Sequence, residues 1–188
     1  MKALFATLAL VLPGLALADS APYLGIQAQY SRLDISTADF QQQPVANIDN
    51  RDYRYAVRIG LQNDLRRYSA KAGRNTLGVE FGYIDFGETS ITVNGNKRRG
   101  DADGFELAMI GSTEVYYNTH LYGRFGGFSW NADGTFTGYR VSVDGEDLLA
   151  GAGILYFIGP LQIRGGYDYY KLEHHRLDVY SLGAQFRF

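Results

Sequence analysis

The sequence predicts an all-β protein, a single eight-stranded antiparallel up-and-down transmembrane β-barrel. Residues 176–188 alternate apolar side chains with small polar ones and end on an aromatic residue, Phe188. Most of seven further segments of similar length repeat this alternation. After residue 18 the chain has no apolar run long enough for a membrane-spanning helix, so a chain that crosses a bilayer must cross it with strands.

The amino terminus predicts export. Lys2 precedes an apolar run over residues 3–12, and residues 16–18 (Ala-Leu-Ala) supply small side chains at a cleavage position. This order is typical of a secretory signal peptide. The alternative is a single membrane-spanning helix, which the short, interrupted run disfavours. We therefore assign residues 1–18 to a signal peptide and residues 19–188 to one outer-membrane β-barrel domain.

The composition fits this class and excludes others. With 23 Gly, 15 Tyr and 11 Phe, the chain is rich in small residues and in the aromatic residues that form girdles at membrane interfaces. It contains no Cys, so no disulfide framework holds an exported chain of this kind together. The formal net charge of −2 provides no field that would attract nucleic acid.

Eight segments have strand character. They are Tyr23–Leu33, Tyr53–Gln62, Asn75–Phe86, Gly104–Gly111, Asn118–Trp130, Asp147–Ile158, Leu161–Leu172 and Arg176–Phe188. Lengths of roughly 9–12 residues suit strands that cross a bilayer at a tilt.

Each strand is oriented by its two-residue period. The apolar faces begin at Leu24, Tyr55, Leu77, Leu121, Leu161 and Tyr180 in strands one to three, five, seven and eight, and continue at every second residue. The sixth strand is apolar on both faces, so its register stays open.

The connections alternate between long and short. Long polar loops are predicted at residues 34–52, 87–103 and 131–146, and the second contains Asn94-Gly95, a signal for an extended hairpin. Short turns are predicted at residues 63–74, 112–117, 159–160 and 173–175. An even number of strands places both termini on one side, which we expect to be the periplasm.

Charge decides which face meets lipid. Arg58, Glu80, Arg124 and Arg164 all lie opposite the apolar positions. With the registers reversed, each basic residue would meet hydrocarbon at a cost of roughly 2–4 kcal/mol near the midplane. The sum is on the order of 10 kcal/mol, which rivals the stability of a whole domain. A soluble barrel with an apolar cavity would bury the same charges, so a membrane barrel with a polar lumen is favoured.

The inward charges form the candidate site. An eight-stranded barrel is wide enough only for its own side chains, and isolated charges there would be too costly, so we expect them to pair. The predicted lumen polar network consists of Arg58, Glu80, Arg124, Arg164 and Asp168. Glu106 joins it if Phe105, Leu107 and Met109 face lipid. We interpret the network as a structural plug, and the alternative is a gated, low-conductance ion path.

Three segments resemble a known family. Residues 78–83 (Gly-Val-Glu-Phe-Gly-Tyr), 124–133 (Arg-Phe-Gly-Gly-Phe-Ser-Trp-Asn-Ala-Asp) and 180–188 (Tyr-Ser-Leu-Gly-Ala-Gln-Phe-Arg-Phe) look like strands three, five and eight of the OmpA-type transmembrane barrel. The resemblance implies this fold over residues 21–188 and a luminal glutamate paired with a seventh-strand arginine, here Glu80 and Arg164. The family's gating scheme also uses a fourth-strand lysine and a sixth-strand acid, which residues 105–111 and 148–158 do not offer.

Catalytic and metal sites are not expected. A serine hydrolase needs Ser and His within hydrogen-bond reach, and His120, His174 and His175 form no His-x-Ser pair. Glu173, beside His174 and His175, lacks the spacing of a known zinc site. Acidic residues at 101–103 and 144–147 resemble fragments of calcium loops, but acidic residues beside Gly are ordinary in loops, so ion binding is the less favoured alternative.

Together these features predict a non-enzymatic integral protein of the Gram-negative outer membrane, with a structural role and loops that contact lipopolysaccharide, host molecules or other envelope components. Lys97, Arg98 and Arg99 are the candidate contacts to lipopolysaccharide phosphates, although they could equally solubilise a loop. Phe188 is expected to engage the barrel-assembly machinery. We expect a monomer without metal or other cofactor. The alternatives are a small gated ion channel and, less favoured, a lipid A-modifying enzyme.

Overall fold

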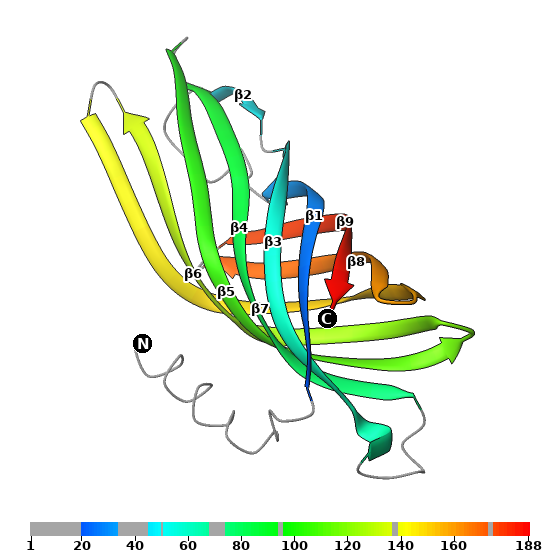
Figure 1. Ribbon diagram of the computed structural model, residues 1–188. Coiled ribbons are helices and arrows are strands. Elements are labelled where there is room, and N and C mark those ends of the chain that lie inside the picture. The colour runs from blue at the N-terminus through cyan, green and yellow to red at the C-terminus, as the bar shows by residue number, and fades with distance from the viewer. Residues whose placement is uncertain are drawn as a thin grey trace.

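The computed structural model describes residues 20–33, 45–49, 51–67, 74–93, 96–136, 139–172 and 175–188, which form an antiparallel β-barrel (Figure 1). The elements are β1 (Ala21–Leu33), β2 (Val45–Asp49), β3 (Arg51–Asp64), the 3-10 helix η4 (Leu65–Arg67), β4 (Asn75–Val93), β5 (Asn96–Tyr116), β6 (Thr119–Phe136), β7 (Tyr139–Ile158), β8 (Leu161–Leu172) and β9 (His175–Arg187). No helix in this part of the chain has the length and apolar character needed to cross a membrane.

Eight of the strands close the barrel. Neighbours pair in the order β3-β1-β9-β8-β7-β6-β5-β4, and the ladder between β3 and β4 completes the circle. The short β2 pairs with the far end of β4 and so extends the sheet beyond the barrel wall. The predicted fold class, an eight-stranded antiparallel barrel, is confirmed.

The two ends of the barrel differ. We call the end at which Ala21 and Arg187 lie the terminal end, and the opposite end the distal end. At the distal end the β4–β5 and β6–β7 hairpins run on as paired strands, well beyond β1, β8 and β9 (Figure 1). Their strands have 18 to 21 residues, whereas β1, β8 and β9 have 12 or 13.

Two predicted connections are corrected by the structure, one between β6 and β7 and one between β5 and β6. The polar loop predicted at residues 131–146 is wrong, because β6 continues to Phe136 and β7 starts at Tyr139. Two strands that pair with each other satisfy each other's backbone groups whatever their side chains, so the sequence need not alternate there. The turn predicted at residues 112–117 is also wrong: β5 runs to Tyr116, and the turn falls at Tyr117-Asn118, where Asn118 has a φ of 56°.

The other two predicted long loops, at residues 87–103 and 34–52, also contain strands. The hairpin predicted within residues 87–103 is confirmed, since β4 and β5 pair as far as Val93 and Asn96. The loop predicted at residues 34–52 contains β2 and the start of β3. The remainder of that loop, including residues 34–44, lies outside the described residues.

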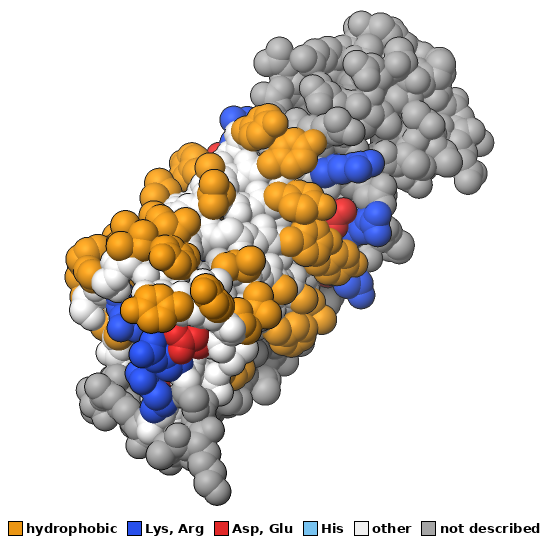
Figure 2. Space-filling view, turned by 90° about the vertical axis from the view of Figure 1, so that its right-hand side faces the viewer, with side chains coloured by type: hydrophobic (Ala, Val, Ile, Leu, Met, Phe, Trp, Pro, Cys, Tyr) orange, Lys and Arg blue, Asp and Glu red, His pale blue; other side chains and the backbone are white. Residues whose placement is uncertain are grey.

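The alternation of faces is confirmed. Exposed outward residues form an apolar band around the barrel, and on the face seen in Figure 2 basic side chains lie at both edges of this band. The band includes Leu24, Ile26, Val57, Ile59, Phe81, Phe105, Leu121, Phe125, Ile154, Leu182 and Phe186. Pairing also fixes the register of the sixth barrel strand, β7, in which Leu149 and Leu155 point inward and Leu148 and Ile154 outward.

Candidate functional site

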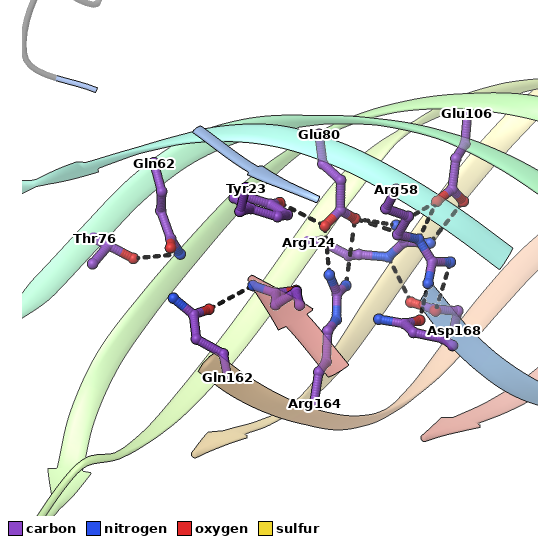
Figure 3. Close-up of polar contacts among 12 residues, drawn as sticks. Tyr23, Arg58, Gln62, Thr76, Glu80, Glu106, Arg124, Gln162, Arg164 and Asp168 are labelled. Atoms are coloured by element: carbon purple, nitrogen blue, oxygen red, sulfur yellow. Dashed lines mark hydrogen bonds and ion pairs between the residues drawn. The ribbon is translucent and has the colours of Figure 1, made fainter. Parts of the chain in front are cut away.

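The inward faces bring six charged side chains together in the middle of the lumen (Figure 3). They are Arg58 on β3, Glu80 on β4, Glu106 on β5, Arg124 on β6, and Arg164 and Asp168 on β8, and each is at most 3% exposed. Three positive and three negative groups balance one another. We call this set the lumen network.

Arg124 is the centre of the lumen network because it donates hydrogen bonds to all three acids. Its Nε donates to Asp168 Oδ1 at 2.7 Å, and its Nη1 donates to Glu80 Oε1 at 2.7 Å. The Nη1 and Nη2 groups bond both oxygens of Glu106, at 2.9 and 2.8 Å. This guanidinium therefore uses all three of its nitrogens on carboxylates, a geometry that lysine could not reproduce.

The other two arginines flank this centre. Arg58 donates to Glu106, and its Nη2 lies 3.6 Å from Asp168 Oδ2. Arg164 pairs with Glu80, which is the pair that the family resemblance implies. Each acid thus contacts at least two arginines, so none of the buried charges is isolated.

Two tyrosines complete the lumen network, and sequence reasoning missed both. Tyr23 Oη donates to Glu80 Oε2 at 2.7 Å. Tyr170 Oη donates to Glu106 Oε2 at 2.7 Å and accepts from Arg124 Nη2 at 3.0 Å. Their positions gave a usable signal, since Tyr170 follows Asp168 by two residues and so shares its inward face.

The structure thus places all five sequence-predicted lumen residues in one cluster and adds Glu106, whose strand turns Phe105 and Met109 outward. The side chains of Lys97, Arg98 and Arg99, the predicted lipopolysaccharide contacts, lie outside the described residues. That assignment stays a prediction.

Apolar layers enclose the lumen network along the barrel axis. Towards the distal end, Phe86 and Phe128 pack edge-on against Tyr170, with ring centroids 5.2 and 4.9 Å away, over Ile84 and Leu149. Towards the terminal end, a smaller cluster is formed by Ile110, Tyr122, Leu155 and Phe157. The charges therefore lie between two layers of packed side chains.

A chain of neutral polar groups lies nearer the terminal end. Gln62 Nε2 donates to Thr76 Oγ1 at 2.9 Å, and Thr76 Oγ1 lies 2.7 Å from Ser112 Oγ. Ser112 Oγ lies in turn 3.2 Å from His120 Nδ1. Sequence spacing missed this Ser–His pair because its members meet across the β5–β6 hairpin. Among the described residues, no acid bonds His120 to orient it as a base.

The described residues contain no group of three His, Cys, Asp or Glu side chains that could hold a metal ion. Glu173, His174 and the side chain of His175 lie outside the described residues.

A closed eight-stranded barrel with an apolar outer band and a charged lumen is an integral membrane β-barrel. The family model described as the OmpA-like transmembrane domain matches residues 18–173, and the chain belongs to this family. It is therefore an outer-membrane β-barrel. A comparison with curated protein sequences gives no match.

Solved structures share the fold. Ail, the attachment invasion locus protein of Yersinia pestis, is 19% identical with a TM-score of 0.58, over 90% of this chain and 99% of Ail. Neisserial surface protein A is 13% identical with a TM-score of 0.56, over 89% and 97% of the two chains. The N-terminal β-barrel domain of Pseudomonas aeruginosa OprF is 18% identical with a TM-score of 0.52, over 90% and 100%.

Proposed function

We propose that this protein is a non-catalytic scaffold of the outer membrane, with periplasmic termini, which presents its distal hairpins to partners outside the membrane. The observation that carries the proposal is the contrast between a filled lumen and extended hairpins. The charged side chains that would line an ion path form ion pairs with one another. The β4–β5 and β6–β7 hairpins, in contrast, project beyond the rest of the barrel.

The packing of the lumen argues against an ion path. A permeating ion would have to separate buried arginine–carboxylate pairs, and such pairs are costly to break. It would then meet the Phe86, Phe128 and Tyr170 layer, which offers aromatic rings and a hydroxyl already bonded to Glu106. Two barriers of different chemistry therefore stand in series.

A surface role agrees with one structural relative. Ail carries attachment and invasion in its name and was solved in complex with the heparin analogue sucrose octasulfate. We propose a surface-contact role of the same general kind for this chain, carried by the distal hairpins. Loops and hairpins on a rigid barrel are the usual carriers of such contacts.

We also propose that the Ser112–His120 pair is structural. Ser112 lies inside the barrel, shares its oxygen with Thr76 and is only 7% exposed, so an acyl chain in the bilayer does not reach it. A change in the acylation of lipid A upon expression of the protein would contradict this part of the proposal.

Planar-bilayer recording tests the scaffold against the channel. We expect the purified mature protein to give no stepwise conductance, and Glu80→Ala to stay silent because the aromatic layer remains. The control is the same protein after heat denaturation, which reveals leaks caused by detergent alone. Discrete, reproducible steps from the folded wild-type protein would overturn the scaffold role in favour of the channel.

A further inference from the structure

Three basic residues gather on the outer surface of one sector of the barrel, near the distal end. Arg32 lies on β1, Arg176 on β9 and Lys171 on β8, and all three side chains are exposed. Arg32 pairs in register with Asp178, and Lys171 pairs with Arg176, so the three lie on adjacent strands. We call them the basic patch.

The basic patch has one acidic neighbour among the described residues, Asp178. Asp178 Oδ1 accepts a hydrogen bond from Tyr167 Oη at 2.6 Å, and Asp178 Oδ2 lies 3.8 Å from Arg176 Nε. Asp178 is therefore the acid that the described residues place among these three cations. Figure 2 shows basic side chains of this kind between the apolar band and the distal end.

A continuous row of tyrosines lies directly below the basic patch. Tyr53, Tyr30, Tyr180 and Tyr167 follow one another across β3, β1, β9 and β8, with ring centroids 5.1, 6.5 and 5.3 Å apart. Below this row, on the same strands, come the exposed aliphatic residues Ile26 and Leu182. The order from aliphatic to tyrosine to cation is the order of a bilayer from acyl chain to interface to headgroup.

Strand geometry sets the depth of the basic patch. Arg32 follows Tyr30 by two residues, which is about 6.6 Å along a strand and about 5 Å along the normal of the membrane at a usual tilt. Tyrosine rings lie at the headgroup boundary, so a cation at this height meets phosphate rather than acyl chain or bulk water.

The basic patch is confined to one sector. On the opposite side of the distal end, the outward residues of β5, β6 and β7 include Asp101, Asp133, Asp144 and Glu146. The described side chains at this end are thus divided by charge, and those of the β8–β9–β1 sector are complementary to an anionic headgroup.

We propose that the β8–β9–β1 sector binds the phosphorylated headgroup of a membrane lipid, with Arg32, Lys171 and Arg176 around the phosphate and the tyrosine row at the boundary between headgroup and acyl chains. Guanidinium groups offer phosphate two parallel hydrogen bonds, and the ammonium group adds a point charge. The site rests on the proposed function, since it requires the distal end to lie at a membrane surface.

Native mass spectrometry of the folded protein in detergent tests the site, with bis-phosphorylated lipid A as the probe. The patch variant is Arg32→Gln/Lys171→Gln/Arg176→Gln. The matched control, Arg66→Gln/Arg74→Gln/Arg187→Gln, removes the same charge at the terminal end. We expect the patch variant to bind lipid A on the order of a hundredfold more weakly than wild type, since each cation near an anionic surface is worth about 1 kcal/mol.

The control variant is expected to bind like wild type, and Arg32→Lys/Arg176→Lys to retain most of the affinity. Enzymatically dephosphorylated lipid A should bind the wild-type protein as weakly as lipid A binds the patch variant. Equal loss in the patch and control variants would overturn the proposal, because it would show attraction by net charge alone. Equal binding of the phosphorylated and dephosphorylated lipids by folded wild type would also overturn it, and would leave the scaffold role standing.

Discussion

At the scale of single residues, Arg124 holds the lumen together. It is the side chain that bonds all three acids at distances of 2.9 Å or less. Glu80 on β4 and Asp168 on β8 are four strands apart, halfway round the barrel, and are joined through it. The neutral balance of three arginines and three acids depends on each member being present.

Replacing Arg124 with methionine should therefore destabilise the protein strongly. The change keeps the bulk of the side chain but leaves three carboxylates with two arginines, and breaking a buried pair of this kind costs about 3–5 kcal/mol. Urea unfolding in lipid vesicles measures the loss. Arg66→Met is the control, because Arg66 forms an exposed pair with Asp64 that solvent screens. Equal losses in the two variants would contradict the central role of Arg124.

At the scale of elements, β6 shows why one face of a strand tolerates change and the other does not. Gly126 points inward, where an added Cβ would lie 2.6 Å from Ala108 Cα and closer still to the Leu107 carbonyl oxygen. Gly123 points outward on the same strand, and an added Cβ there would meet only the Gly151 carbonyl oxygen at 4.0 Å.

We therefore expect the two alanine substitutions to change the free energy of unfolding differently. Gly126→Ala must push the backbone of β5 away and is expected to lower the free energy of unfolding by about 1–3 kcal/mol. Gly123→Ala gains contact with lipid and restricts the unfolded chain, so it should be neutral or stabilising by about 0.5 kcal/mol. Urea titration of both variants in the same vesicles compares them directly. Similar destabilisation by both would show that the inward packing does not decide the outcome.

The strands also show where the alternation of apolar and polar residues fails to predict a strand or its orientation. Where one face meets lipid and the other the lumen, as from Leu77 to Ile84, the two-residue period gave strand and orientation together. Where both faces meet water, as in β6 beyond Trp130, the period is lost and an extended strand looks like a loop. In β7 the period fails for the opposite reason, since Leu149 and Leu155 supply apolar groups to the lumen.

At the scale of the whole molecule, the described side chains of the distal rim are divided by charge. Asp101 on β5 lies directly opposite Asp133 on β6, and Asn131 lies opposite Asp144 on β7. Like charges in directly opposed positions destabilise a sheet. Their cost is offset when a cationic partner binds, so the β5–β7 surface favours a basic segment of a partner, in contrast to the basic patch on β8, β9 and β1.

A cationic peptide should therefore bind the acidic side of the rim. We expect an oligolysine peptide to bind the protein in nanodiscs of zwitterionic lipid, and Asp101→Asn/Asp133→Asn to weaken this binding several-fold, as the loss of two attractive charges at an exposed site requires. The control is Asp64→Asn/Glu114→Gln at the terminal end, and surface plasmon resonance measures both. If Asp101→Asn/Asp133→Asn bound the peptide with unchanged affinity, the inference that this surface favours a cationic partner would be refuted.

The sequence by itself determined the barrel, the face that meets lipid and the five charged residues of the lumen, because a strand with lipid on one side must alternate and cannot expose a charge to hydrocarbon. Only the tertiary structure decided which inward groups meet. Closure of the sheet brings β3, β4, β5, β6 and β8 to one point, so that Arg124 reaches three acids and Tyr23 and Tyr170 complete their hydrogen bonds. It also decided the height and sector of the basic patch, since these depend on how strands distant in sequence are staggered around the barrel.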